Sequence, residues 1–164
     1  MEVATTTQAP QSSRPSAVPW PPILLVAGIV AAILLERAYP LAWPGLDDLA
    51  ASIIGYAFGA AGLGLIVWGL VTLLRARTTA LPHRGAERLV THGAYAFRRN
   101  PIYMGDALLF LGLAEATGNI WLVIVAPVFA IAVLALAILP EERHLEARFG
   151  DAYLDYKERT RRWF

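Results

Sequence analysis

Four apolar segments constrain the fold of this chain more than any other feature of its sequence. They cover residues 20–39, 49–74, 102–116 and 120–139. A helix needs about 20 mostly apolar residues to cross the hydrocarbon core of a bilayer, and it satisfies its own backbone hydrogen bonds there. The third segment is shorter and contains Asp106 and Glu115. The pattern predicts an all-α, integral membrane helical bundle with about four transmembrane helices.

The overall composition agrees with this fold class. Apolar residues make up 57% of the chain and charged residues 16%, whereas a typical soluble domain has roughly 45–50% and about 25%. The chain of 164 residues contains no cysteine, which excludes disulfides, thiolate metal ligands and cysteine nucleophiles. Its three histidines do not have the spacing of a zinc site, so we predict no metal and expect solvated histidines.

Basic residues are unevenly distributed between the connections. Residues 75–99 and the tail after residue 140 are rich in arginine, but residues 39–48 and 117–119 contain no lysine or arginine. Because basic connections stay on the cytoplasmic side, we expect a multi-pass protein with both termini in the cytoplasm, in the inner (plasma) membrane if the source is a bacterium. Anionic membrane lipids explain the arginine clusters, and no nucleic-acid-binding motif is present.

Three regions follow from this pattern. Residues 1–19 are rich in Thr, Ser, Gln, Ala and Pro and are expected to form a disordered tail. Residues 20–80 hold the first two transmembrane helices. Residues 81–164 hold a core made of a transmembrane hairpin and a C-terminal cytoplasmic helix.

Two local features predict how the helices are shaped and packed. Gly55 and Gly59 are four residues apart, and Ala60 with Gly64 repeats the spacing, which lets helix backbones approach closely in lipid. The same spacing permits pairing between copies, so the oligomeric state stays open. Pro127 predicts a kink in the last apolar segment.

Two polar stretches, residues 93–103 and 140–150, each lie against the end of an apolar segment. Charged groups beside lipid are costly and often functional. The connection at residues 117–119 is very short, so the third and fourth segments should form a tight helical hairpin. We therefore expect residues 98–103 to lie near residues 139–142.

The first polar stretch has the features of an anion-binding helix start. Asn100 suits the capping position and Pro101 the first helical position. The backbone N–H groups there can bind a carboxylate, and Arg98 and Arg99 add positive charge. Tyr95 and Tyr103 offer aromatic faces to a base or a cation. The alternative is that these side chains only anchor the helix end at the membrane interface.

The second polar stretch begins with two adjacent carboxylates. Glu141 and Glu142 directly follow Pro140, and they could accept hydrogen bonds from ligand hydroxyls or pair with Arg98 or Arg99. The alternative is an acidic pair within an i,i+4 network of its own helix. The basic end at residues 158–162 is expected to be solvated or to face lipid.

These motifs, in this order, resemble the isoprenylcysteine carboxyl methyltransferase and phospholipid methyltransferase superfamily. The resemblance runs from about residue 81 to the C-terminus and rests on Leu89-Val-Thr-His-Gly-Ala-Tyr95, Arg99-Asn-Pro-Ile-Tyr-Met-Gly105, Glu141-Glu142, Phe149-Gly150, Tyr153 and Tyr156. It implies a membrane methyltransferase that takes S-adenosyl-L-methionine from the cytosol and a lipophilic small molecule or lipid-linked acceptor from the bilayer.

Carried over residue by residue, the resemblance implies a methyltransferase core over residues 81–164 with a cytoplasmic cofactor pocket. It implies catalytic roles for Glu141 and Arg99. The residues implied to hold the cofactor are Glu87, Arg88, Leu89, Val90, Tyr95, Asn100, Pro101, Ile102, Tyr103 and Glu142.

Three positions differ from the usual pattern of the superfamily. Asn100 stands where the motif has histidine, and Ala94 stands where it has proline. Ala137 stands where the eukaryotic carboxyl methyltransferases carry an arginine thought to hold the substrate carboxylate. These differences leave two alternatives open, which are phospholipid N-methylation and a non-enzymatic binding or assembly protein on the same fold.

Overall fold

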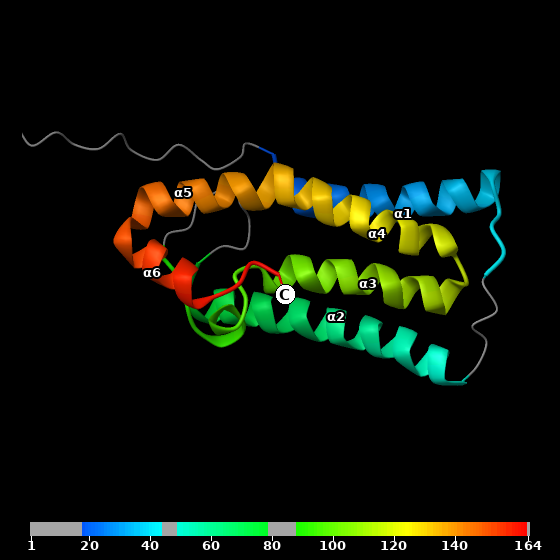
Figure 1. Ribbon diagram of the computed structural model, residues 1–164, viewed down its shortest axis with the longest axis horizontal. Helices are drawn as coiled ribbons and strands as arrows, with labels where there is room; N and C mark the ends of the chain where they lie inside the picture. The colour runs from blue at the N-terminus through cyan, green and yellow to red at the C-terminus, as the bar shows by residue number, and fades with distance from the viewer. Residues whose placement is uncertain (1–17, 44–48, 79–87, 164) are drawn as a thin grey trace, which may run out of the picture.

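The computed structural model describes residues 18–43, 49–78 and 88–163, and within them the chain is almost entirely helical. The four long helices are α1 (Trp20–Ala38), α2 (Leu49–Arg75), α3 (Pro101–Thr117) and α4 (Ile120–Val133), and they run alternately up and down (Figure 1). The smaller elements are η2 (Gly93–Ala96), η3 (Leu134–Ile138), α5 (Leu139–Phe149) and α6 (Asp151–Arg159). The tail predicted to be disordered lies outside the described residues, apart from its last two.

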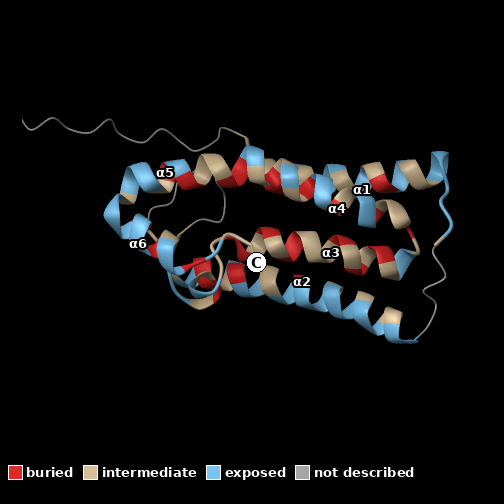
Figure 2. Cartoon of the chain, viewed as in Figure 1, coloured by how far each residue is buried: buried red, intermediate tan, exposed pale blue. Residues whose placement is uncertain are grey.

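Three described helices are long and apolar enough to cross a membrane. They are α1, α2 and the continuous helix from Ile120 to Phe149, with mean hydropathies of 1.8, 2.0 and 3.1. Helix α3 has only 17 residues and lies between α2 and α4, where it is the most covered of the four (Figure 2). The all-helical prediction is confirmed for the described residues, while a fourth span and the orientation of the termini stay predictions.

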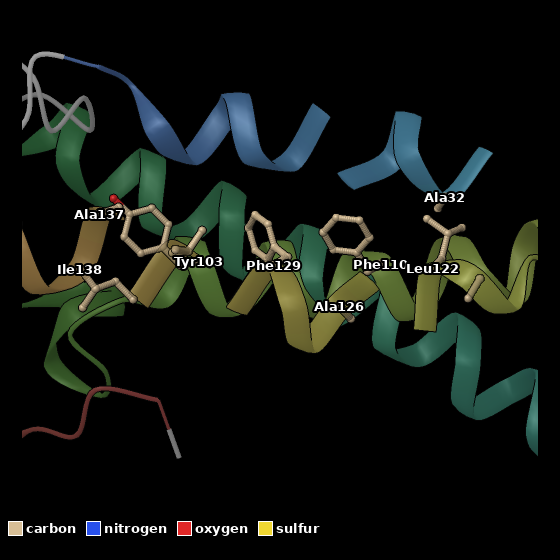
Figure 3. Packing of buried hydrophobic residues seen from close by; sticks show 10 residues of the cluster. Ala32, Tyr103, Phe110, Leu122, Ala126, Phe129, Ala137 and Ile138 are labelled. Carbon is tan, nitrogen blue, oxygen red and sulfur yellow. The ribbon is translucent and has the colours of Figure 1, made fainter. Parts of the chain in front are cut away.

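The hydrophobic core is a row of side chains between α1, α3 and α4 (Figure 3). Phe110 and Phe129 are its largest pair, with ring centroids 5.1 Å apart. By contrast, many large apolar side chains on the outward faces of α1 and α2 are exposed. A bundle with a small interior and an apolar exterior suits lipid as its solvent.

Glycines line the contact between α2 and α3. A Cβ on Gly112 would lie 2.2 Å from the Cα of Gly59, and a Cβ on Gly62 would lie 2.7 Å from the carbonyl oxygen of Gly105. The predicted close packing at Gly59 is therefore confirmed, and its partner is α3 of the same chain. The prediction is wrong for Gly64, because a Cβ there would meet nothing within 4 Å.

The turn between α3 and α4 forms the predicted hairpin. Gly118 has a left-handed φ of 63°, which favours glycine. Asn119 accepts a hydrogen bond from the Trp121 N–H at 2.9 Å and donates its side-chain amide to the Ala32 carbonyl at 3.1 Å. One side chain thus caps α4 and ties the hairpin to α1.

The last long helix is continuous through Pro127, and its regular hydrogen bonding changes farther on. At η3 the helix widens into a π-turn, in which the Leu139 N–H donates to the Leu134 carbonyl. Pro140 follows directly and has no N–H to donate. The π-turn therefore lies where the series of α-helical backbone hydrogen bonds is already interrupted by Pro140. Helix α5 then continues to Phe149.

The chain turns back after α5 and ends beside the start of α3 (Figure 1). Gly150 makes the turn with a φ of 51°, and α6 follows. Residues 160–163, named here the C-terminal strap, then run alongside residues 98–99. Arg98 and Arg161 form an isolated parallel β-bridge, and the Arg99 N–H donates to the Arg161 carbonyl at 3.0 Å.

Candidate functional site

A cavity of about 260 Å³ lies at the end of the bundle where α3 begins and α5 follows the π-turn. It is slightly below the roughly 300–1,000 Å³ typical of small-ligand sites. Its apolar wall comes from Pro21, Pro22, Leu25, Leu70, Leu73, Leu89, Val90, Ile102 and Leu145. Its polar wall comes from Thr78, Arg88, Tyr95, Arg99, Asn100, Tyr103, Asp106, Glu141, Glu142, Tyr153 and Tyr156.

The cavity brings together nearly all of the site residues expected from the sequence. Every described member of that set lines it except Pro101, which is fully buried as the first residue of α3. Glu87 lies outside the described residues. The assignment of these residues to cofactor binding and catalysis stays a prediction, but their juxtaposition is a structural fact.

Glu141 faces α3 across the hairpin. The Tyr103 hydroxyl donates to its carboxylate at 3.2 Å, although the two residues are 38 positions apart. This contact confirms the expectation that the start of α3 lies near the end of the last apolar segment. No guanidinium in the described part of the chain pairs with this carboxylate.

Glu142 is held between two guanidinium groups. Arg99 Nε lies 3.3 Å from its Oε1. Arg162 donates from Nε to Oε1 at 2.9 Å and from Nη2 to Oε2 at 2.6 Å. The hydrogen bond to Glu142 raises the pKa of Arg162. The expected pairing of Arg99 with a carboxylate is confirmed, and the partners of Glu142 lie outside its own helix, contrary to the i,i+4 alternative.

Arg162 corrects the interpretation of the basic C-terminal end. That end was expected to be solvated or lipid-facing, which is wrong for Arg162, because its side chain is only 33% exposed and bound to Glu142. The physical reason is the turn at Gly150, which returns the chain to the carboxylate. A sequence pattern gives no signal for a pairing across two helices.

Arg99 also binds the end of α6. Its Nη1 donates to the carbonyl oxygens of Lys157, at 2.9 Å, and of Thr160. The last carbonyls of a helix have no partner within the helix, so a guanidinium there satisfies them. Arg99 is therefore bonded both to α5, through Glu142, and to the end of α6.

Asn100 occupies the capping position of α3 but does not cap it. No hydrogen bond runs from the helix backbone to its side chain, so the predicted side-chain cap is wrong. The residue is 8% exposed, and its Nδ2 is buried with no hydrogen-bond partner among the described residues. An unsatisfied buried donor is costly, and at a cavity wall it is a natural contact for a ligand oxygen.

Three tyrosines from η2 and α6 complete the polar wall. The Tyr156 hydroxyl donates to the Tyr95 carbonyl at 2.7 Å. Burial raises the pKa of Tyr156 to about 12, although the Arg99 charge and the Thr160 hydroxyl oppose the shift. Burial likewise raises the pKa of Tyr95 and of Tyr153. All three phenols are therefore neutral hydrogen-bonding and stacking groups near neutral pH.

The raised pKa of Tyr156 predicts a loss of stability at high pH. The pKa of a tyrosine is near 10 in the unfolded chain and about 12 at Tyr156 in the folded protein. The contribution of the neutral Tyr156 phenol to the stability of the fold is therefore complete below about pH 10 and is lost as the pH rises toward 12. We expect the gap in melting temperature between wild type and Tyr156→Phe to shrink over that range. Tyr39→Phe, at a residue that is 67% exposed, should show no such change, and a gap independent of pH would contradict the prediction.

Asp106, Tyr153 and Tyr156 also line the cavity, although no role was predicted for them from the sequence. Asp106 is buried on α3, one helical turn after Tyr103 on the same face. An acidic residue within an apolar segment was the available signal. Tyr153 and Tyr156 are also three residues apart on one helix, and both are buried against the cavity.

The two described histidines differ in exposure, and His83 lies outside the described residues. His92 is exposed, as expected. His144 is only 9% exposed, so the expectation of a solvated side chain is wrong for it. It lies on α5 two residues after Glu142, in the part of that helix that packs inward.

Three described helices of membrane-crossing length are typical of a membrane protein, and a cavity with carboxylates in its wall lies at one end of the bundle. The family model described as phospholipid methyltransferase matches residues 50–152. The chain belongs to this family, which confirms the superfamily recognised from its motifs. Membership implies methyl transfer at a membrane, with lipids as substrates.

One relative is similar to part of the chain. A Haemophilus influenzae protein described as uncharacterized is 34% identical over 64 residues, which cover 98% of that protein and 38% of this chain. No solved structure gives a significant match.

Proposed function

We propose that the chain transfers a methyl group from S-adenosyl-L-methionine to a lipophilic acceptor inside this cavity. One observation carries the proposal: the motif residues from η2, α3 and α5 converge on a single cavity with a polar and an apolar wall. Family membership supplies the reaction class. The cofactor, the acceptor and the roles below are parts of the proposal.

The polar wall fits the cofactor's functional groups. The buried Asn100 amide can donate to a carboxylate or a ribose hydroxyl, and the start of α3 favours an anion. Tyr95 and Tyr153 offer faces for the adenine ring or the cationic sulfur. When bound, S-adenosyl-L-methionine supplies an electrophilic methyl group on a positively charged sulfur.

The apolar wall suits the acceptor. Leu25 comes from α1, and Leu70 and Leu73 come from α2, so part of the wall belongs to two helices that can contact lipid. An alkyl chain that moves from the bilayer to this wall exchanges one apolar environment for another, so close packing rather than the hydrophobic effect would hold it there. The hydrocarbon part of the acceptor would lie against this wall and its reactive group beside the polar one.

The charges around the cavity favour an amine acceptor over a carboxylate. Glu141 and Asp106 supply two carboxylates, and Arg99 is already engaged by Glu142 and by the end of α6. The remaining guanidinium on the wall, Arg88, is solvent-exposed. Position 137 is a buried alanine, so it offers nothing to bind a substrate carboxylate.

An amine attacks only when it is unprotonated, so its proton must leave. Glu141 is placed to accept that proton, because no cation in the described residues competes for its carboxylate. As the new N–C bond forms, the C–S bond breaks, and the sulfur leaves as a neutral thioether. Holding the two partners in line supplies most of the rate enhancement in such a displacement.

The proposal is tested by ligand binding and by product chemistry. Purified protein in detergent should bind S-adenosylhomocysteine in calorimetry, and membranes with labelled cofactor should yield a labelled lipid. The label should survive base treatment, as an N-methyl group does and a methyl ester does not. A label that base treatment releases would mean that the acceptor is a carboxylate and not an amine. No binding at millimolar ligand would contradict the proposal and favour a non-enzymatic role.

A further inference from the structure

We infer that the C-terminal strap assembles the cofactor side of the cavity, and that Arg162 is its positioning residue. The inference rests on the proposed function only where it concerns cofactor binding. Arg162 does not line the cavity. Its effect on the site is exerted through Glu142, which does.

The strap ties three elements of the cavity wall together. Its backbone accepts a hydrogen bond from the Arg99 N–H at residue 161, just before α3 begins. Arg99 in turn holds the carbonyl oxygens of Lys157 and Thr160 at the end of α6. Because α6 carries Tyr153 and Tyr156, docking of the strap fixes these rings relative to α3.

The carboxylate of Glu142 is the centre of this arrangement. Its side chain is 9% exposed and shared by Arg99 and Arg162. Charge-assisted bonds with two-pronged geometry fix the orientation of both partners. Removing Arg162 leaves the buried Glu142 carboxylate with Arg99 as its remaining partner. The carboxylate is then free to reorient or to draw Arg99 away from α6.

An apolar contact anchors the other end of the strap. Trp163 packs against the hydrophobic core. It also borders an apolar groove of about 520 Å³ between α3 and α4, beside Met104, Leu108 and Leu134. An indole at a membrane surface prefers such a half-buried position. The strap is thus held by the ion pair of Arg162 with Glu142 and by the packing of the Trp163 ring.

The inference predicts that Arg162→Gln weakens S-adenosylhomocysteine binding at least tenfold and raises the KM for the cofactor without changing the KM for the acceptor. Arg162→Lys keeps the charge without the two-pronged contact and should recover part of the loss. Arg159→Gln is the matched control, because this arginine is exposed and its hydrogen bond within the described residues goes to the Asp155 carbonyl of its own helix. It should stay within twofold of wild type.

A second measurement needs no ligand. The Lys157 carbonyl belongs to a bond that trypsin cleaves, and Arg99 covers it. Release of the strap should speed cleavage after Lys157 at least fivefold in Arg162→Gln, as followed by intact mass spectrometry. Trp163→Ala should act in the same direction and replaces Arg162→Gln if that variant does not fold.

The two measurements separate the inference from the proposed function. Unchanged affinity together with unchanged cleavage in Arg162→Gln overturns the role of the strap. Equal losses in Arg159→Gln also overturn it, since they would reflect only lost positive charge. Wild-type protein that binds no S-adenosylhomocysteine overturns the proposed function, and the cleavage rates then still decide whether Arg162 holds the strap.

Discussion

Glu141→Gln is expected to lower kcat at least a hundredfold, which corresponds to about 2.7 kcal/mol of lost transition-state stabilisation. The amide preserves the shape of the side chain and its contact with the Tyr103 hydroxyl. It cannot take up a proton and carries no charge to stabilise a cationic group. Affinity for S-adenosylhomocysteine should change much less than kcat, as measured by calorimetry and by methyl transfer under saturating cofactor.

Glu146→Gln provides the control for this substitution. Glu146 lies on the same helix as Glu141 but is exposed and pairs with Lys157. Its replacement should leave kcat within twofold of wild type. A Glu141→Gln enzyme that retains more than a third of wild-type turnover would remove Glu141 from the proposed chemistry.

Gly112→Ala is expected to lower the free energy of unfolding by about 3 kcal/mol or more. The new methyl group would lie 2.2 Å from the Gly59 Cα and 2.7 Å from its nitrogen. Both are backbone atoms and cannot rotate away, so α2 and α3 must separate. Loss of close contact along a glycine seam is especially costly in lipid, where packing rather than hydrophobicity holds helices together.

Gly64→Ala is the matched substitution on the same pair of helices. A Cβ at Gly64 meets nothing within 4 Å, and alanine is the better helix former by about 0.5–1 kcal/mol. This variant should therefore be as stable as wild type or slightly more stable. SDS titration of both variants in mild micelles, followed by tryptophan fluorescence, makes the comparison. Equal stabilities would mean that the seam is not close-packed.

Local patterns accounted for most of the helical framework. Apolar run length anticipated the ends of α1 and α2 to within about one residue, because bilayer-length runs have few alternatives to a helix. The short connection at residues 117–119 anticipated the hairpin. It thereby predicted that Tyr103 lies near Glu141, which the hydrogen bond between them confirms.

Features that depend on distant contacts could not be anticipated in this way. The bond between Arg162 and Glu142 requires a turn at Gly150, a helix of suitable length and a returning strap. Asn100 has every local property of a capping residue, yet its amide is left unsatisfied at the cavity wall. Tertiary packing decides which hydrogen bonds these side chains form, because a side chain with several possible partners can bind only those that packing brings within reach.

The π-turn at η3 sets the direction in which the cavity-lining side chains of α5 point, independently of the packing of α4. Each residue of an α-helix advances its side chain by about 100° around the axis, and a π-turn in effect accommodates one additional residue. Deleting a residue from η3 would leave α4 in its contacts with α1 and α3, but it would rotate Glu141 and Glu142 away from Tyr103 and Arg99. A relative lacking that residue would have to present its carboxylates from different sequence positions, so the register of this turn matters as much as the identity of the glutamates.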